Sequence, residues 1–343
     1  MKLKNLGEYG LVNEITGWLQ ASLRKPVRDK TVIVPPGDDA AVIKSPKRPL
    51  IFTTDMLFED MHFCLSWAGA AGGRKAFFEA LGYKSLAVNL SDLSSMGAKP
   101  APIYCLIGVG LPESIEVEDV RSLYRGLNKF CNKYNITIIG GDTNASQKLT
   151  IAITLVGIAG SHTTRRSGAK PGDKIYLSGP LGDSAAGLHV LLNPVKPRSK
   201  HFSRFLSTLR IRKNLIRKHF YPPVRIKEAQ SIAKQASSMI DCSDGLVNSI
   251  NLICEMSKTG AAINLDLIPV SPGLKQYSRL ASVNPMDFAL YGGEDYELIF
   301  TSKKPLSGFK SLGTIENKNK GIKYYLNDKE TKIKKEKLYQ HFK

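Results

Sequence analysis

Several features that define common protein classes are missing from this 343-residue sequence. No stretch approaches the ~20 apolar residues that a membrane-spanning helix needs, so no membrane association is expected. Residues 1–15 lack a continuous apolar segment and therefore do not predict a secretory signal. The five cysteines are odd in number and include no CxxC pair. This favours reduced thiols in a cytoplasmic protein over disulfides or a zinc site.

The common signatures of phosphate binding and nucleophilic catalysis are missing as well. There is no GxxxxGK[ST] loop, and the GxG at residues 108–110 lacks the third glycine and the helix of a dinucleotide site. A GxSxG elbow is absent, and no Ser-His-Asp or Cys-His order is apparent. Any phosphate chemistry must therefore use a different arrangement of side chains.

The composition is that of an ordinary globular protein, with 42% hydrophobic and 23% charged residues. The length exceeds the usual limit for one core, which predicts two domains. Helical periodicity covers residues 7–24, 74–96 and 117–134, and strands are expected at 101–111 and 149–159. Such alternation in both halves predicts α/β plus α+β structure, with domains at residues 1–160 and 161–343.

Three further strands are expected next to polar turns or loops. Residues 49–55 are apolar and β-branched and predict a buried strand that ends in an acid. Residues 136–142 predict a strand that runs into a Gly-Gly-Asp turn, and residues 261–270 predict another strand.

The net charge of +19 comes from two segments. Residues 196–227 hold eleven Lys or Arg and no acid, and residues 303–343 hold twelve Lys and four acids. Nucleic-acid binding would have to use these segments. Neither interleaves its bases with a regular aromatic pattern, so a solvated surface is favoured and nucleic acid is an unlikely partner. Residues 196–210 are interpreted as an insertion or mobile linker.

Acidic residues recur in glycine-rich turns, mostly after apolar strands. Any one of them is explained equally well as a helix cap or Asx-turn. If nearly all of these carboxylates lay close together, they would repel one another unless cations were bound. Oxygen ligands without a Cys or His cluster suit Mg²⁺. The pattern predicts a multi-Mg²⁺ phosphate site formed by Asp38, Asp39, Asp55, Asp142, Asp241, Asp244, Glu294 and Asp295, with Asp92 in a helical context.

Two other side chains are weaker candidates. His62 lies near an acid cluster, and packing at a helix end explains it about as well as a functional role. Arg166 is either a surface arginine or a guanidinium that binds polyphosphate.

Seven motifs occur in the order seen in the thiamine-monophosphate kinase family, which the chain resembles from about Gly7 to its C-terminal LYQHF. They are PPGDDAAVI, FTTDMLFEDMHF, YKSLAVNLSDLSSMGAKP, IIGGDTN, RRSGAKPGDKIYLSGPLGDSAAGL, IDCSDGL and YGGEDYELIFT. Several recur in the wider superfamily of aminoimidazole-ribonucleotide synthetase and selenophosphate synthetase, so they indicate ATP-dependent chemistry more firmly than the acceptor. The segment 196–210 and Asn144, where Thr or Ser is usual, depart from the family pattern.

The resemblance implies a homodimer in which strands of both N-terminal domains form a β-barrel flanked by helices, followed by a C-terminal α+β domain. It implies direct transfer of the γ-phosphoryl group of ATP to thiamine monophosphate, without a phosphoenzyme. The implied Mg²⁺ ligands are Asp39, Thr53, Thr54, Asp55, Asp92, Asp142, Asp241 and Asp244. The implied ATP contacts are Tyr124, Gly141, Asp142, Arg166 and Ser243, and the implied thiamine monophosphate contacts are His62, Glu294 and Tyr339.

The implied reaction agrees with the residues. A monophosphate is largely ionised at neutral pH, given a second pKa near 6, so it needs no general base. In-line transfer relies on positioning and on cations that neutralise both phosphates. Two alternatives remain: another ATP-dependent enzyme of the superfamily with a different acceptor, or a basic nucleic-acid-binding protein.

Overall fold

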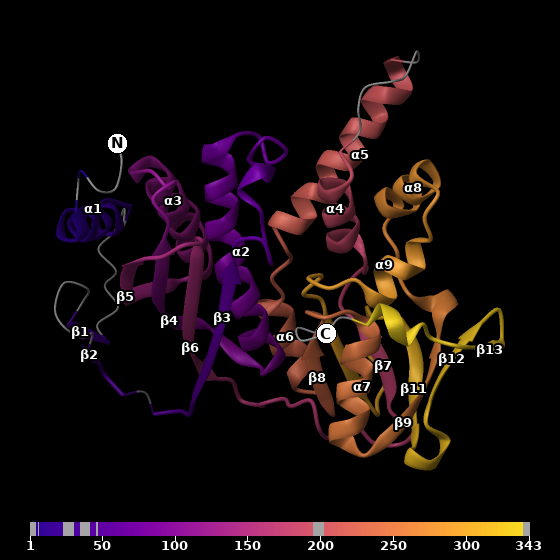
Figure 1. Ribbon diagram of the computed structural model, residues 1–343. Coiled ribbons are helices and arrows are strands. Elements are labelled where there is room, and N and C mark those ends of the chain that lie inside the picture. Colours follow the sequence, from indigo (N-terminus) through magenta and orange to yellow (C-terminus); the bar gives the residue numbers. More distant parts are fainter. Residues whose placement is uncertain are drawn as a thin grey trace. The chain divides into compact units, whose positions relative to one another are not determined.

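The computed structural model describes residue 5 and residues 7–22, 31–34, 42–45, 47–194 and 202–338. The chain divides into two compact units (Figure 1). The first unit comprises Met1–Leu93 and Ala98–Ala159, and the second comprises Ser94–Gly97 and Gly160–Lys343. Within the described ranges, no helix is both long and apolar enough to cross a membrane.

The first unit is built on a four-stranded sheet of strand order β3-β6-β4-β5. Neighbouring strands are antiparallel except for β4 and β5, which are parallel and are joined by helix α3. A parallel pair requires such a crossover connection. The bounds are β3 (Leu50–Phe58), β4 (Ala98–Leu111), α3 (Val117–Tyr134), β5 (Ile136–Ala145) and β6 (Thr150–Ala159).

The residues at the two ends of helix α3 explain where this helix begins and ends. Its N-terminus has a capping box, in which the side chains of Glu116 and Asp119 each accept a backbone N–H of the other. Its C-terminus ends at Asn135 in the left-handed conformation. It packs closely on α2 (Arg74–Ser95), because a Cβ at Gly126 would lie 2.0 Å from the carbonyl oxygen of Glu79. Only glycine permits this approach.

The two faces of the four-stranded sheet differ. We call the face covered by α2 the helix face, where Gly157 lies against the Leu93 side chain. On the opposite side, the open face, Phe52 is 66% exposed and Met56 and Leu106 are also exposed. The cross-strand register places these three side chains together with Thr154. A short hairpin of β1 (Val32–Val34) and β2 (Val42–Ile43) packs on the open face, and helix α1 (Gly7–Ser22) contacts α3.

Two strands of this unit differ from the sequence prediction. The buried strand expected at residues 49–55 extends to Phe58 and alternates between half-buried and exposed side chains, because the open face is covered only in part. The strand expected to end at Asp142 extends to Ala145, because its pairing with β4 continues to that residue. Asp55 and Asp142 therefore lie inside strands rather than in turns.

The second unit contains a mixed sheet of strand order β13-β12-β9-β11-β7-β10-β8. Only the β12–β9 pair among the described strands of this sheet is parallel. The bounds are β7 (Lys174–Leu177), β8 (Ser238–Asp241), β9 (Thr259–Asn264), β10 (Leu298–Ser302), β11 (Ser311–Asn317), β12 (Ile322–Leu326) and β13 (Lys329–Thr331). Strand β9 ends earlier than expected from residues 261–270, because the Asn264 side chain accepts the Asp266 N–H and starts a 3₁₀ turn.

Helices pack on both faces of this sheet. Helix α7 (Leu246–Ser257) contributes to the main core on one face, and α6 (Ile226–Ala233) packs against β7, β8 and β10 on the other. A third cluster joins α4 (Asp183–Leu192), α5 (Phe202–Phe220) and α8 (Pro272–Ala281), and α9 (Pro285–Tyr291) precedes β10.

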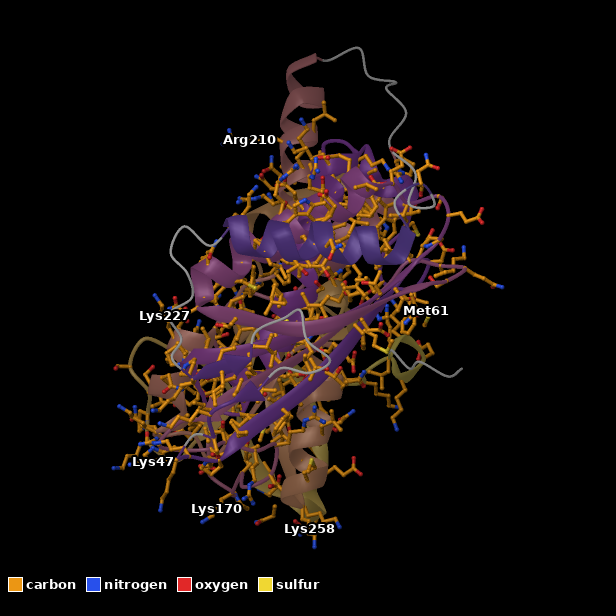
Figure 2. All side chains as sticks on the ribbon, turned by 90° about the vertical axis from the view of Figure 1, so that its left-hand side faces the viewer. Lys47, Met61, Lys170, Arg210, Lys227 and Lys258 are labelled. Carbon is orange, nitrogen blue, oxygen red and sulfur yellow. The ribbon has the colours of Figure 1, made fainter. Side chains whose placement is uncertain are left out.

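Helix α5 corrects the interpretation of the basic segment. Residues 202–220 form one helix, because buried Ile211 and Leu215 pack against α4 and α8. Of the expected linker, residues 196–201 lie outside the described ranges. Basic side chains such as Lys170, Arg210, Lys227 and Lys258 are exposed on this unit (Figure 2).

Candidate active site

A hydroxyl and a carboxylate meet on the helix face of the first unit. Thr53 Oγ1 donates a hydrogen bond of 2.5 Å to Asp92 Oδ2, which α2 brings over β3. Asp55 follows Thr53 by two residues and therefore points to the same face. Mg²⁺ prefers hard oxygen ligands in octahedral geometry at about 2.0–2.1 Å, and two such oxygens already converge here. The donor set of this group fits that ion.

Strand alternation separates other predicted ligands from this group. Thr54 points to the open face, where its hydroxyl donates to the Ile153 carbonyl and accepts from Thr154 Oγ1, both at 3.1 Å. Asp142 pairs with Gly108, whose partner across β6 is Ala152, so Asp142 also lies on the open face. The structure thus brings Thr53 and Asp92 together and leaves Thr54 and Asp142 on the other side of the sheet.

The Gly-Gly-Asp segment has two local constraints. A Cβ at Gly141 would lie 2.0 Å from the Ile107 carbonyl oxygen, so this position requires glycine. The Asp142 carboxylate accepts the Thr143 N–H at 2.8 Å and the Asn144 amide at 2.6 Å. The unusual Asn144 therefore acts as a donor that holds this carboxylate in place.

The turn after β3 fixes the ring of His62. Its Nδ1 accepts the Phe58 N–H at 3.1 Å, so the neutral ring carries its proton on Nε2. The turn is tied to the loop before β6, because Glu59 accepts the Leu149 N–H at 2.9 Å and Lys148 pairs with Asp60 at 2.5 Å. A donor at Nε2 suits a phosphate oxygen.

Tyr124 does not lie on an open surface. The residue is 4% exposed within α3, and its ring lies 6.3 Å from that of Trp18 on α1. Burial raises the pKa of its phenol well above the usual range. The structure thus gives Tyr124 a packing role, and its expected contact with ATP stays a prediction.

In the second unit, two motif segments lie side by side. Asp241 ends β8 and is buried, and Ser243 and Asp244 form the turn before α7. The Glu294 N–H donates to the Ser243 carbonyl at 2.6 Å, and the Tyr296 N–H donates to the Cys242 carbonyl at 2.9 Å. The IDCSDGL turn and the GGEDYEL loop are therefore joined through their backbones.

Each acid of the GGEDYEL loop has its own anchor. Asp295 is buried and accepts the N–H groups of Gly182 at 2.6 Å and Ser184 at 3.3 Å, at the start of α4. Burial raises the pKa of this carboxyl to about 8, which the two donated hydrogen bonds offset only in part. Glu297 accepts two hydrogen bonds from Arg225, at 2.6 and 2.8 Å.

The remaining predicted residues are more scattered. Arg166 is exposed, and its carbonyl accepts a hydrogen bond from the Ser257 hydroxyl. Asp39 and Tyr339 lie outside the described ranges. Within those ranges, no group of three or more His, Cys, Asp or Glu side chains is arranged to hold a metal ion.

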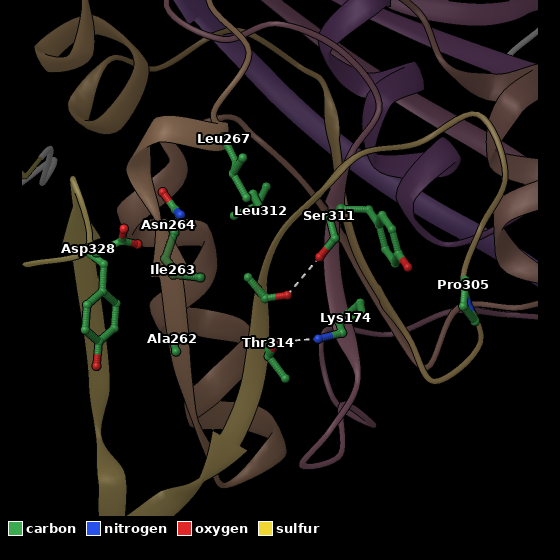
Figure 3. A pocket seen from close by; sticks show the side chains of 13 residues that line it. Lys174, Ala262, Ile263, Asn264, Leu267, Pro305, Ser311, Leu312, Thr314 and Asp328 are labelled. Carbon is green, nitrogen blue, oxygen red and sulfur yellow. Dashed lines mark hydrogen bonds between the residues drawn. The ribbon is translucent and has the colours of Figure 1, made fainter.

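The second unit also carries a hollow of about 580 Å³ over β7, β9 and β11 (Figure 3). Lys174 on its wall donates to Thr314 Oγ1 at 3.0 Å, and Asn264 and Asp328 add polar groups. None of the predicted site residues lines this hollow. It is not part of the predicted active site.

Comparisons with known proteins match both halves of the chain to one family, in chain order. Residues 37–159 match the N-terminal domain of AIR synthase related proteins, and residues 170–311 match the C-terminal domain of that family. The thiamine-monophosphate kinase of Aquifex aeolicus is 34% identical over 320 residues, covering 92% of this chain and 94% of the relative. That of Bacillus subtilis is 30% identical and covers 98% of this chain and 100% of the relative. The chain belongs to the thiamine-monophosphate kinase family.

Solved structures of the thiamine-monophosphate kinase family agree with this assignment. One described as AaThiL complexed with AMPPCP and TMP is 33% identical, with a TM-score of 0.73 over 100% of this chain and 99% of that chain. The Stenotrophomonas maltophilia enzyme has a TM-score of 0.76 at 27% identity, covering 95% of this chain and 98% of that chain. The resemblance and the two-domain α/β fold are confirmed. In the described residues no strands close into a barrel.

Sequence reasoning did not single out two residues that hold the GGEDYEL loop. Arg225 and His219 both come from the segment KHFYPPVRI, residues 218–226. The segment was treated only as part of a basic stretch. No local signal in this segment pointed to these partners, and only the fold shows that His219 meets Glu294 and that Arg225 pairs with Glu297 as well as with nearby Glu228.

Proposed function

We propose that this chain transfers the γ-phosphoryl group of ATP to thiamine monophosphate, giving thiamine diphosphate and ADP. The observation that carries the proposal is the match over 100% of this chain to a structure described as complexed with AMPPCP and TMP. Relatives named thiamine-monophosphate kinase, at 30% and 34% identity, support the same acceptor.

Several Mg²⁺ ions are proposed to take part. When bound, they would neutralise the charge of the two phosphates as these approach each other. The geometry supports Thr53 and Asp92 most directly, because their oxygens already converge. The other proposed ligands are Asp39, Thr54, Asp55, Asp142, Asp241 and Asp244, and the proposed ATP contacts are Tyr124, Gly141, Asp142, Arg166 and Ser243.

Thiamine monophosphate is proposed to contact His62, Glu294 and Tyr339. The Nε2–H of His62 would donate to a phosphate oxygen, and the Glu294 carboxylate would face the cationic part of the acceptor. We propose direct in-line transfer, because an ionised phosphate is already a nucleophile and needs only to be held in line with ATP.

A homodimer is proposed for this chain. Phe52, Met56 and Leu106 form an exposed apolar group on the open face, and β3 is an edge strand of its sheet. Exposed apolar sheet faces and unpaired edges favour association with another chain. A second copy pairing at this face would form the implied barrel. A cytoplasmic location is also proposed, since all five cysteines are free.

The proposal is tested by incubating the purified protein with thiamine monophosphate and MgATP, and following thiamine diphosphate by chromatography. Equimolar formation of thiamine diphosphate and ADP is expected. Unphosphorylated thiamine and aminoimidazole ribonucleotide precursors serve as competing acceptors. Turnover with one of these and none with thiamine monophosphate would refute the proposal and favour another enzyme of the superfamily.

A further inference from the structure

Glu294 lies in an unusual and firmly held position. Its backbone is in the left-handed region, with φ of 64°, which a non-glycine residue seldom adopts. Its N–H is bound to the Ser243 carbonyl at 2.6 Å. Its side chain is 22% exposed, and one carboxylate oxygen lies 3.2 Å from Nδ1 of His219. The backbone and one side-chain oxygen are therefore held while part of the carboxylate remains accessible.

The chemistry of this contact specifies the proton. His219 Nδ1 faces Glu294 Oε2 at 3.2 Å and Ser184 Oγ at 3.1 Å. A bare nitrogen lone pair facing a carboxylate oxygen at this distance would be repulsive. A hydrogen on Nδ1 makes the contact with Glu294 attractive, because a carboxylate can only accept, and the Ser184 hydroxyl lies within hydrogen-bond distance of the same nitrogen. His219 is 1% exposed, so water does not compete for this donor.

A close helix contact places His219 there. The residue lies near the C-terminal end of α5, and α5 packs against α4 at Gly187. A Cβ at Gly187 would lie 2.3 Å from the Leu215 carbonyl oxygen and 3.0 Å from the Cβ of His219. Because Gly187 has no side chain, α5 approaches closely enough for His219 to reach Ser184 and Glu294.

We propose that His219 is a positioning residue that orients the Glu294 carboxylate for binding the cationic aromatic part of thiamine monophosphate. This rests on the proposed function, because Glu294 is taken there as an acceptor contact. His219 does not touch the acceptor. Instead it sets the direction of the Glu294 carboxylate, which contacts the acceptor. In this way the position of helix α5 affects the affinity for thiamine monophosphate.

The test compares His219→Leu, which removes the donor, with His219→Asn, whose amide places an N–H near the position of Nδ1. His189→Leu is the matched control, because His189 is a half-buried histidine that bonds Tyr277 instead of the GGEDYEL loop. His219→Leu is expected to raise the KM for thiamine monophosphate about tenfold, the factor for losing one hydrogen bond to a charged group. The KM for ATP and kcat should change less than twofold.

Three further results are expected. His219→Asn should return the KM for thiamine monophosphate to within about threefold of wild type, and His189→Leu should leave it unchanged. In a Glu294→Gln background, His219→Leu should have no additional effect, because both changes remove the same interaction. Equal increases in both KM values, no recovery with Asn, or additive effects would each overturn the positioning role.

Calorimetric binding of thiamine monophosphate separates this inference from the proposed function. A wild type that binds the compound but forms no thiamine diphosphate would refute the kinase proposal. The positioning role would still be supported if His219→Leu weakened binding about tenfold. Equal affinities for the wild type and the variant, or no binding by the wild type, would overturn it.

Discussion

The carboxyl group of Asp295 makes the stability of the protein depend on pH. It is 4% exposed, and burial raises its pKa from 3.8 to about 8 even though two backbone N–H groups donate to it. Between these values the folded chain binds a proton that the unfolded chain has released. The resulting stabilisation is complete below pH 3.8 and is lost as the pH rises to about 8.

Asp295→Asn tests this dependence, because asparagine keeps the size of the side chain and removes the titration. One pKa unit corresponds to about 1.36 kcal/mol, so the wild type should lose about 2.7 kcal/mol between pH 5 and pH 7 relative to the variant. Any constant effect of the new amide, which points a donor at Gly182 or Ser184, cancels when the two pH values are compared.

The assay is urea unfolding of both proteins at pH 5, 6, 7 and 8, in buffer with a chelator and without substrates. The free energy of unfolding of Asp295→Asn minus that of wild type should rise steadily from pH 5 and level off above pH 8. A difference that stays constant over this range would mean that the carboxyl is ionised in the folded protein. The two N–H donors would then outweigh burial, and the reasoning would be refuted.

Three other predictions concern the site and its support. Asp92→Ala and Asp142→Ala should each abolish thiamine diphosphate formation and leave the circular dichroism spectrum native, because each removes a proposed metal ligand; near-normal turnover at ordinary Mg²⁺ would contradict that role. His62→Ala should raise the KM for thiamine monophosphate and spare that for ATP in steady-state assays. A phosphohistidine trapped in acid-quenched wild type and absent from the variant would instead identify a nucleophile. Arg225→Ala should lower the free energy of unfolding by about 3–5 kcal/mol in urea titrations, because it leaves Glu297 buried without its guanidinium partner; a loss under about 1 kcal/mol would be inconsistent with that pairing.

Local elements with strong periodicity were predictable from the sequence. The helix expected at residues 117–134 is α3 (Val117–Tyr134), and that expected at 74–96 is α2 (Arg74–Ser95). In α3 the capping residues and the apolar spacing agree, so local and tertiary preferences coincide. Strand ends were less predictable, because β5 extends to Ala145 only through its pairing with β4.

The basic segment shows the limit of reading charge alone. Eleven Lys or Arg without an acid in residues 196–227 suggested a solvated surface, and residues 196–210 were interpreted as an insertion or mobile linker. Ile211 and Leu215 are nevertheless buried against α4 and α8, so residues 202–220 form a packed helix. The few apolar positions decide the structure, because burying them is favourable whatever the charge of the other side chains.

The sequence by itself determined the family, because glycine-rich acidic motifs in a specific order survive as local patterns of residue types. It also indicated which acids to expect at the site. Only the tertiary structure decided which of them meet. Thr53 and Thr54 are neighbours in the chain, yet alternation along β3 turns Thr53 to Asp92 and Thr54 to the opposite face. His219 and Glu294 are 75 residues apart and meet because α5 packs on α4 at Gly187. Such contacts depend on packing between distant segments, and no local pattern of residues records them.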